Sequence, residues 1–403
     1  MKRLPFLLPL LFLTVTSAAT SLPPQGAAVL SAFLKASTAR GDIPGVVVAV
    51  VAKEGTLYEE AFGVSSTVSK RPMTKDTIFN MASMTKPITS VAIMMLVDEG
   101  KLKLDDEVAK YLSKYKDPLV ITKFNEADAS YETRLAKRPI TIRHLLTHTS
   151  GIGYAFSSPM LTKIMQKTGK TELDLPLLFD PGDSWAYGAS TRVLGQVVEA
   201  VSGQKLDAFL DSRILQPLGM TDTSYLVPKT KYSRVVAVNA RGNDGKFVER
   251  PMPDTLPATV QGDGGLYGTA SDYGKFLRML LNGGKLGETR LLSEKAVKTM
   301  LAPNTGAVVV KEQQSANLSL SKNFPLGAGK DKWGLGFQLA AQQLPNRRSP
   351  GSGTWAGIFN THFFIDPTRS IGVVVMMQTL PFYDEASMKV YAGVEEAVYR
   401  NIK

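Results

Sequence analysis

The sequence predicts a mixed α/β (α+β) fold, in which an antiparallel sheet is built from both ends of the chain and a mainly helical region is inserted between them. Strand-like stretches occur near the N-terminus and again in the last third of the 403-residue chain, whereas the middle carries apolar residues at helical spacing. Hydrophobic residues make up 44% of the chain, which is enough for a sizeable packed core and argues against disorder.

The first predicted strands lie close to the N-terminus. Residues 45–52 read GVVVAVVA, a nearly continuous β-branched run that is typical of a strand buried on both faces. A Lys-Glu-Gly turn at 53–55 follows, so residues 56–62 are expected to pair with the first strand as a hairpin.

The middle of the chain is predicted to be helical. Apolar residues recur at helical spacing in four stretches: 85–99, 141–146, 191–201 and 271–281. The first of these helices is expected to stop at Gly100. Residues 116–137 are polar and charged and indicate a surface excursion, and residues 303–332 lack periodicity, which indicates a long loop.

The last third is rich in strand signals. Residues 334–339, 358–365 and 372–377 predict three antiparallel strands, with Asp366-Pro367-Thr368 as a hairpin turn between the last two. Residues 383–401 predict a closing helix. The prediction that results is a sheet region of about 20–80 and 290–403 around a helical region of about 81–289.

Residues 1–19 predict a secretory signal peptide. Lys2 and Arg3 form a short positive region, an apolar stretch follows, and small residues at 17–19 suit a signal peptidase. The mature protein, residues 20–403, is expected to be exported to the periplasm or secreted, with no membrane span after signal removal. An uncleaved anchor is the alternative.

Composition excludes several classes of function. The chain has no cysteine, which excludes thiol catalysis, thiolate metal sites and disulfides. The formal charge is +11, of which Lys2 and Arg3 contribute two, but basic residues are scattered among acidic ones. This pattern indicates a solvated basic surface, and an exported chain without a basic stripe is not expected to bind nucleic acid.

The three histidines, His144, His148 and His362, do not suggest a histidine-based site. No Gly-x-Ser-x-Gly elbow occurs in the chain, so an α/β-hydrolase triad has no anchor. His144 and His148 are four residues apart, which could resemble a metal-binding pair, but no acidic partner stands near them in the sequence. We interpret them as structural and expect no metal or organic cofactor.

Ser83-Met84-Thr85-Lys86 is the strongest candidate for a catalytic motif. A serine and a lysine three residues apart share one helical face, here at the start of the buried stretch that opens with FNMASMTK. In a dry cleft beside other cations a lysine loses its proton more readily and can act as a base. The N–H groups at a helix N-terminus can also stabilise an oxyanion. The motif alone has little specificity, since Ser113 and Lys116 repeat the spacing.

Around this motif the sequence resembles the serine β-lactamase and DD-peptidase superfamily, which includes the class C β-lactamases, and most of all its family VIII carboxylesterases. Five stretches carry the resemblance, in the family's order: the S-x-x-K helix, LLTHTSGI from Leu145, PGDSWAYGAS from Pro181, GDGGLYGTASDYGKFL from Gly262 and WGLGFQL from Trp333. The resemblance implies a β-lactamase/transpeptidase-like fold and a serine nucleophile, Ser83.

The resemblance also implies a role for Tyr187, which stands where the family usually has Y-x-N. The third residue is Ala189 instead of asparagine, so the amide that holds a substrate's side-chain amide in β-lactamases is missing. Tyr187 can still share a proton with Ser83 and Lys86. A buried tyrosine that serves stability alone is the structural alternative.

The family's third element is normally K-T-G on an edge strand. A literal match at 167–169 precedes Tyr187 and lies on no apparent strand, so we interpret it as accidental. Trp355-Ala356-Gly357 resembles the W-x-G of family VIII esterases. That alignment implies an oxyanion hole made by the backbone N–H groups of Ser83 and Ile358. Gly357 would let the substrate lie close to the strand, and Trp355 would replace a cation with an apolar wall.

The sequence therefore predicts a serine hydrolase for short-chain carboxylic esters, acting through an acyl-Ser83 intermediate that water or another acceptor resolves. A small-molecule ester is the expected partner, and the oligomeric state stays open. A β-lactamase or DD-peptidase is the alternative, since the basic loop near Arg347 and Arg348 could supply the missing cation. A non-catalytic penicillin-binding-like recognition module is the second alternative.

Overall fold

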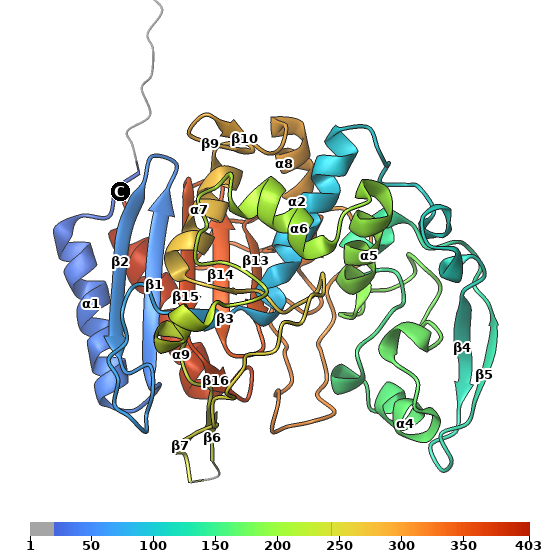
Figure 1. Ribbon diagram of the computed structural model, residues 1–403, viewed down its shortest axis with the longest axis horizontal. Coiled ribbons are helices and arrows are strands. Elements are labelled where there is room, and N and C mark those ends of the chain that lie inside the picture. Colours follow the sequence, from blue (N-terminus) through green and yellow to red (C-terminus); the bar gives the residue numbers. More distant parts are fainter. Residues whose placement is uncertain (1–19, 243) are drawn as a thin grey trace, which may run out of the picture.

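The central element of the structure, a computed structural model, is a seven-stranded antiparallel sheet that both chain ends build (Figure 1). The structure describes residues 20–242 and 244–403. The predicted signal peptide, 1–19, lies outside the described residues. Within them, no helix combines the length and apolar character that a bilayer crossing needs.

The sheet has the order β11-β12-β13-β14-β15-β1-β2. Its strands are β1 (Gly45–Ala52), β2 (Thr56–Gly63), β11 (Lys332–Trp333), β12 (Gln338–Leu339), β13 (Gly353–Gly357), β14 (Thr361–Asp366) and β15 (Ile371–Met376). The N-terminal β1 pairs with the C-terminal β15, with Val48 opposite Val375. The mixed fold with an antiparallel sheet from both ends is thereby confirmed.

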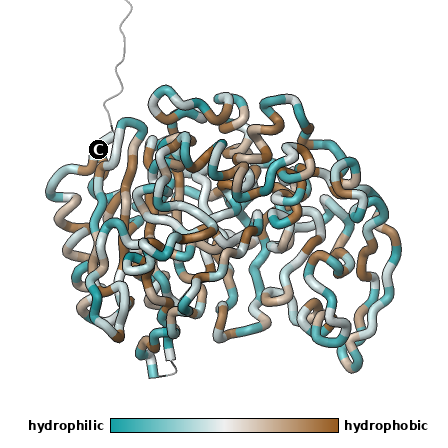
Figure 2. Tube along the Cα trace, viewed as in Figure 1, coloured by the Kyte–Doolittle hydropathy of each residue, from teal (hydrophilic) through white to brown (hydrophobic). Residues whose placement is uncertain are grey.

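Helices cover both faces of the sheet, which explains the continuous apolar run of β1. Side chains alternate between the faces of a strand. Val46, Val48 and Val50 belong to the core cluster that includes α1 (Pro24–Ala39) and α9 (Glu385–Asn401), whereas Val47 and its alternate neighbours face the larger core. Figure 2 shows β1 as a largely apolar segment between these layers.

On the other face of the sheet, α7 (Ala270–Leu281) packs against β1 and β15. The N-terminal helix α1, which packs on α9 and β2, was not predicted from the sequence. Its start is marked by Pro24, and its buried face includes Leu30 and Leu34, a spacing of one helical turn.

The remaining helices lie mainly in the middle of the chain. They are α2 (Thr85–Asp98), α3 (Ile142–Leu146), α4 (Pro159–Thr168), α5 (Ser190–Ser202), α6 (Leu206–Leu210) and α8 (Glu294–Met300). The five predicted helices match α2, α3, α5, α7 and α9 within two residues at each end. The polar excursion forms an exposed hairpin of β4 (Leu119–Phe124) and β5 (Tyr131–Leu135), and the stretch predicted as a long loop contains no helix.

Two predicted strands are wrong in part. Of residues 334–339, only β12 is a strand, because Gly336 has a φ of 96° and donates its backbone N–H to the Leu146 carbonyl. Residues 358–365 do not run as one strand either. A turn separates β13 from β14, and Asn360 adopts the left-handed conformation there with a φ of 59°.

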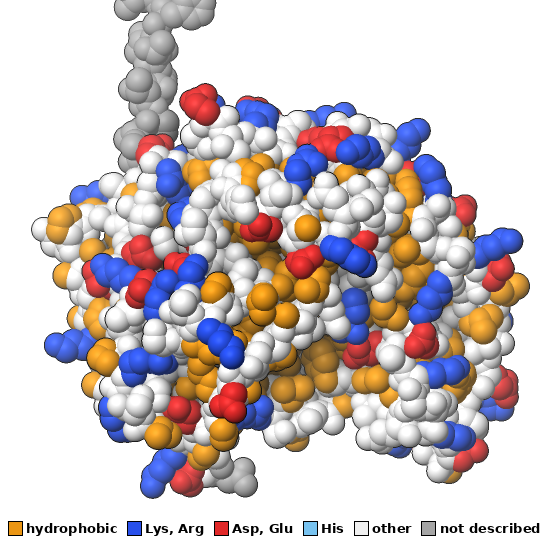
Figure 3. Space-filling view, in the orientation of Figure 1, with side chains coloured by type: hydrophobic (Ala, Val, Ile, Leu, Met, Phe, Trp, Pro, Cys, Tyr) orange, Lys and Arg blue, Asp and Glu red, His pale blue; other side chains and the backbone are white. Residues whose placement is uncertain are grey.

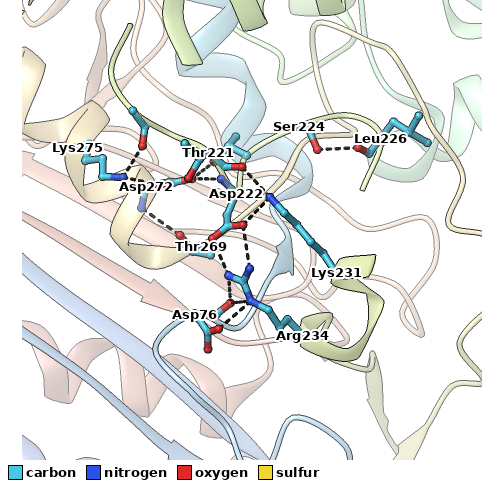
Figure 4. Close-up of polar contacts among 12 residues, drawn as sticks. Asp76, Thr221, Asp222, Ser224, Leu226, Lys231, Arg234, Thr269, Asp272 and Lys275 are labelled. Atoms are coloured by element: carbon cyan, nitrogen blue, oxygen red, sulfur yellow. Dashed lines mark hydrogen bonds and ion pairs between the residues drawn. The ribbon is translucent and has the colours of Figure 1, made fainter. Parts of the chain in front are cut away.

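A polar network supports the segment that leads to Ser83. The short strand β3 (Phe79–Asn80) pairs with β8 (Tyr267–Gly268), and the preceding Ile78 exchanges backbone hydrogen bonds with Arg234 and Val236. Figure 4 shows the guanidinium of Arg234 between Asp222 and Asp76. It donates to both carboxylate oxygens of Asp222, over 2.9 and 2.6 Å.

Small strand pairs complete the molecule. They are β6 (Asn239–Arg241) with β7 (Phe247–Glu249) and β16 (Thr379–Leu380), and β9 (Lys285–Leu286) with β10 (Thr289–Arg290).

Candidate active site

Ser83 lies in a 3-10 turn (Ala82–Met84) that runs directly into α2. Ala82, the residue before it, has a φ of 44°, a conformation that costs energy for a side chain with a Cβ and is often found at functional sites. In the first turn of a helix, backbone N–H groups have no partner within the helix. The Ala82 N–H donates to the Asn80 side chain and the Met84 N–H to the Met81 carbonyl, so of this turn the Ser83 N–H is the amide that could meet an oxyanion beside the Ser83 hydroxyl.

Lys86 follows one helical turn later and points at Ser83. Its Nζ donates to Ser83 Oγ over 3.0 Å and to the backbone carbonyl of Asp263 over 2.7 Å. The lysine is 2% exposed. The spacing of the S-x-x-K motif thus produces the contact that helical geometry predicts.

Tyr187 comes from the segment just before α5 and completes a triangle around the serine. Its hydroxyl donates to Ser83 Oγ over 2.7 Å, and Lys86 Nζ lies 4.8 Å from the centre of its ring. The three side chains that the sequence singled out are therefore in mutual contact. Two groups that can exchange a proton with it converge on one hydroxyl oxygen, an arrangement that can activate a serine nucleophile.

Trp355 lies on β13, at the edge of the same site. Its indole Nε1 donates to the Tyr187 hydroxyl over 3.3 Å, and the two ring centres are 4.7 Å apart. From the sequence, Trp355 was predicted to form only an apolar wall here. The structure adds a hydrogen bond to a residue that touches Ser83.

Gly357 and Ile358 follow on the same chain segment, Gly357 at the end of β13 and Ile358 in the turn after it. A Cβ at Gly357 would collide with the Met81 carbonyl and the Thr361 hydroxyl. The glycine therefore lets β13 approach the Ser83 turn, and the close approach of a substrate stays a prediction. Ser83, Gly357 and Ile358 line one cavity.

That cavity has a volume of about 340 Å³. Figure 3 shows apolar side chains gathered in the middle of this face of the molecule and Lys and Arg side chains scattered over the rest. The aromatic side chains that line the cavity are Tyr154, Phe156, Tyr187, Trp355, Phe359 and Phe382. A site of this kind suits a small, largely apolar molecule.

Among the described residues that line the cavity, the one basic side chain is Arg192. Its Nε donates to Asp263 over 3.1 Å and its second contact is with Glu172 over 3.0 Å. The cation suggested for the loop near Arg347 is not there: Arg348 is buried and donates to Glu395 over 2.8 Å, away from the cavity lining.

The other sequence candidates lie where a structural role was expected. Ala189 is fully buried at the start of α5. The literal K-T-G spans the end of α4 and its cap, Gly169, and lies on no strand. His148 is buried among aromatic rings, 5.1 Å from that of Tyr187. Burial, and then the charge of Lys86, lowers the pKa of His148 well below its usual range.

Neither of the other histidines lies at a metal site. His144 caps α3, with its Nδ1 accepting from the Thr141 N–H. His362 stacks on Tyr391 at 4.3 Å, and burial lowers its pKa to about 3. In the described part of the chain, no three His, Asp or Glu side chains are grouped to hold a metal ion.

Sequence reasoning missed the polar wall of the cavity, which Tyr154, Arg192 and Asp263 form with Glu172. In the sequence, Asp263 stands out only as part of the stretch GDGGLYGTASDYGKFL that carries the family resemblance. The signal that could have found it is a charged residue set between glycines, where a loop exposes backbone to a site.

Known proteins with the same organisation include esterases. A model of the Beta-lactamase family matches residues 30–396. Esterase EstB of Burkholderia gladioli is 30% identical over 391 residues, covering 87% of this chain and 90% of the esterase. Lovastatin esterase of Penicillium rubens is 28% identical over 392 residues, covering 89% and 95%.

Among solved structures, a mutant (LovD6) of simvastatin synthase from Aspergillus terreus superimposes with a TM-score of 0.80. It is 26% identical to this chain, and the match covers 94% of this chain and 98% of the synthase. The family match spans nearly the whole chain, and its esterase relatives are similar over most of their length. The chain belongs to the Beta-lactamase family, as a serine hydrolase of the β-lactamase and DD-peptidase superfamily with esterase relatives.

Proposed function

We propose that this chain hydrolyses short-chain carboxylic esters through an acyl intermediate on Ser83. The observation that carries the proposal is the triangle of Ser83, Lys86 and Tyr187, with both partners within 3.0 Å of one hydroxyl oxygen. Both groups donate to Ser83 Oγ in the structure, and when one of them has lost a proton the pair can take the serine proton as the oxygen attacks a carbonyl carbon.

The proposed reaction has two halves. In the first, the Lys86–Tyr187 pair must lack one proton, so that it can accept the proton of Ser83 as Oγ bonds to the carbonyl carbon. The backbone N–H groups of Ser83 and Ile358 donate to the oxyanion. Collapse expels the alcohol, which takes the proton. In the second half, water bonds to the acyl carbon and gives one proton to the pair. The bond between that carbon and Ser83 Oγ then breaks, Ser83 takes the proton back, and the acid leaves. A second alcohol in place of water gives acyl transfer.

The cavity walls favour an uncharged ester over a β-lactam. A β-lactam presents a carboxylate, and here that group would meet the Trp355 indole and a guanidinium already paired with two carboxylates. A buried polar group without a partner costs about 1–3 kcal/mol, and more when it is charged. Since about 1.4 kcal/mol is a tenfold change in rate, this loss is large.

The alternative functions differ in what they require of this site. A β-lactamase or DD-peptidase would use the same triangle but needs a group for the substrate carboxylate. A non-catalytic recognition module needs the cavity without the triangle. The contacts of Lys86 and Tyr187 with Ser83 Oγ argue against a non-catalytic recognition module. The ion pairs of Arg192 with Asp263 and Glu172 argue against a β-lactamase or DD-peptidase, because they leave no free cation for the substrate carboxylate.

The test compares nitrophenyl acetate and butyrate with benzylpenicillin and a chromogenic cephalosporin. We expect kcat/KM on the esters to exceed that on the β-lactams by at least about a hundredfold. Comparable values would sink the esterase proposal and favour the β-lactamase alternative. Covalent labelling of Ser83 by a fluorophosphonate separates an enzyme from a recognition module, which would not react.

A further inference from the structure

The amine of Lys86 is held at two points. Besides Ser83 Oγ, its Nζ contacts the backbone carbonyl oxygen of Asp263 over 2.7 Å. A lysine side chain is a flexible four-carbon stem, so a single contact does not fix where its nitrogen lies. The Asp263 carbonyl is therefore the second point that directs the amine toward the serine.

The loop that carries this carbonyl is flexible by composition. Asp263 stands in the sequence Gly262-Asp263-Gly264-Gly265, and Gly265 has a φ of 103°. Glycine allows many backbone conformations, so the three glycines do not themselves set the direction of the carbonyl. The contact between Thr89 and the Gly262 carbonyl, over 2.7 Å, ties the start of the loop to α2.

The side chain of Asp263 provides the remaining restraint. One carboxylate oxygen accepts a hydrogen bond from the Tyr154 hydroxyl, and the other accepts from Arg192 Nε over 3.1 Å. The Asp263 side chain is 3% exposed. Arg192 is held in turn by Glu172 over 3.0 Å.

These partners come from different elements of the helical region. Tyr154 precedes a 3-10 turn (Ala155–Ser157), Arg192 lies on α5, and Glu172 starts another short turn (Glu172–Asp174). Burial, together with the nearby Asp263 charge, raises the pKa of Tyr154 well above its usual value, so the phenol keeps the proton that it donates at neutral pH. The glycine loop is thus fixed to elements that do not themselves touch Ser83.

We propose that Asp263 is a positioning residue for the hydrolysis, and that Tyr154 and Arg192 clamp its carboxylate so that its backbone carbonyl directs the Lys86 amine at Ser83. The proposal rests on the proposed function, in which Lys86 acts on Ser83. The carboxylate itself faces Tyr154 and Arg192, so it has no proton-transfer role in the reaction. A misplacement of about 1 Å in a reacting group can cost about a hundredfold in rate.

The test measures kcat and KM separately on nitrophenyl butyrate. Asp263→Ala is expected to lower kcat by about 30- to 100-fold with KM within about threefold, because the nucleophile loses activation and the cavity keeps its aromatic walls. Asp263→Asn keeps an acceptor for Tyr154, so it should recover kcat to within about tenfold of the wild type. Tyr154→Phe and Arg192→Gln should each lower kcat, with losses that do not multiply in the double variant.

The matched control is Asp180, a carboxylate that is also 3% exposed and paired with an arginine, Arg134. It does not line the cavity. Asp180→Ala should lower the melting temperature while kcat stays within about threefold of the wild-type value. If Asp263→Ala does not fold, Asp263→Asn and Tyr154→Phe decide the matter by the same kcat and KM comparison.

Two results would overturn the proposal. One is an unchanged kcat in folded Asp263→Ala or Tyr154→Phe, and the other is a raised KM at constant kcat, which would make the network a substrate-binding wall. Failure of the proposed function gives a different result, because Ser83→Ala would then keep its activity. If only the positioning role of Asp263 is wrong, Ser83→Ala is still inactive.

Discussion

The indole Nε1 of Trp355 donates a hydrogen bond to the hydroxyl oxygen of Tyr187 across 3.3 Å. The same hydroxyl donates to Ser83 Oγ over 2.7 Å. An oxygen that already accepts one hydrogen bond is oriented to donate the other way, so the indole favours the rotamer of the tyrosine proton that points at the serine. Trp355 thus connects β13 to the nucleophile through one intermediate group.

Replacing Trp355 by Phe is expected to lower kcat on nitrophenyl butyrate by about 2- to 10-fold, the equivalent of one net hydrogen bond of about 0.5–1.5 kcal/mol. KM should change little, because the ring that remains still lines the cavity. The control is Trp185→Phe, since the indole nitrogen of Trp185 is buried and has no hydrogen-bond partner in the described residues. Equal losses in both variants would show that ring volume, not the hydrogen bond, matters.

Ser83→Ala should abolish ester turnover by orders of magnitude and leave the melting temperature nearly unchanged. A small side chain at a cavity contributes little packing, whereas the acyl-enzyme needs its oxygen. Ser113→Ala is the matched control, because Ser113 and Lys116 repeat the S-x-x-K spacing at an exposed turn. Retention of more than about a tenth of the activity in Ser83→Ala would contradict the assignment.

Lys86→Ala and Tyr187→Phe should each cause a severe loss, and the double variant should be little worse than the harsher single one. Groups that share one proton path act as a unit, so their effects do not add as free energies. The comparison uses kcat/KM from the four proteins of the cycle. Losses that simply multiply would show that one of the two residues is only structural.

The contacts among Ser83, Lys86 and Tyr187 could be anticipated to different degrees. Ser83 and Lys86 are three residues apart, and helix periodicity alone brings them together. Tyr187 is 104 residues from Ser83, and only the family resemblance pointed to it. Nothing local links Asp263 to Tyr154, 109 residues away, so the network behind Lys86 could not be predicted.

In the fold too, elements that depend on nearby residues could be predicted, and those that depend on distant contacts could not. The strand at 45–52 was predicted with its bounds, because a run buried on both faces has a composition of its own. The turn that separates β13 from β14 was missed, because it depends on Asn360 adopting a positive φ inside an apolar stretch. The side chain of Asn360 donates to the Thr379 and Pro381 carbonyls, partners that only the folded chain supplies.

Stability in acid should depend on Asp222. The hydrogen bonds from Arg234, opposed by partial burial, lower its pKa from 3.8 to about 2. Because the folded pKa is the lower one, the carboxylate contributes its full stabilisation above about pH 4 and loses it as the pH falls through about 2. At pH 7, Asp222→Asn should lower the free energy of unfolding by about 1–3 kcal/mol.

The measurement is urea unfolding of wild type and Asp222→Asn between pH 7 and pH 2. The difference in the free energy of unfolding between the two proteins should stay constant down to about pH 4 and then shrink. The exposed Asp117 provides the control, since Asp117→Asn should change stability little at any pH. A difference that does not depend on pH would mean that the Arg234 contact does not require the charge.

The length of the acyl group should be limited by Phe382. Its backbone is fixed on both sides, by hydrogen bonds with Leu320 and Lys322 over 2.9 Å each, and its ring lines the cavity. Ser83 lies on the wall of the same cavity, so the Phe382 ring can limit how far an acyl chain on Ser83 extends. We therefore expect the wild type to favour nitrophenyl acetate and butyrate over octanoate.

In Phe382→Ala the removed ring gives the acyl chain further apolar wall to contact. Each additional buried methylene contributes about 0.8 kcal/mol, or about a fourfold change in kcat/KM. The ratio of kcat/KM on octanoate to that on butyrate should therefore rise by at least about tenfold, from two or more newly buried methylenes. Phe324, whose ring centre lies 5.3 Å from that of Phe382 but which does not line the cavity, gives the control. Phe324→Ala should lose stability and keep the wild-type ratio. An unchanged ratio in Phe382→Ala would mean that the acyl chain lies elsewhere, along Phe156 or Phe359. Phe156→Ala or Phe359→Ala would then be expected to raise the ratio instead.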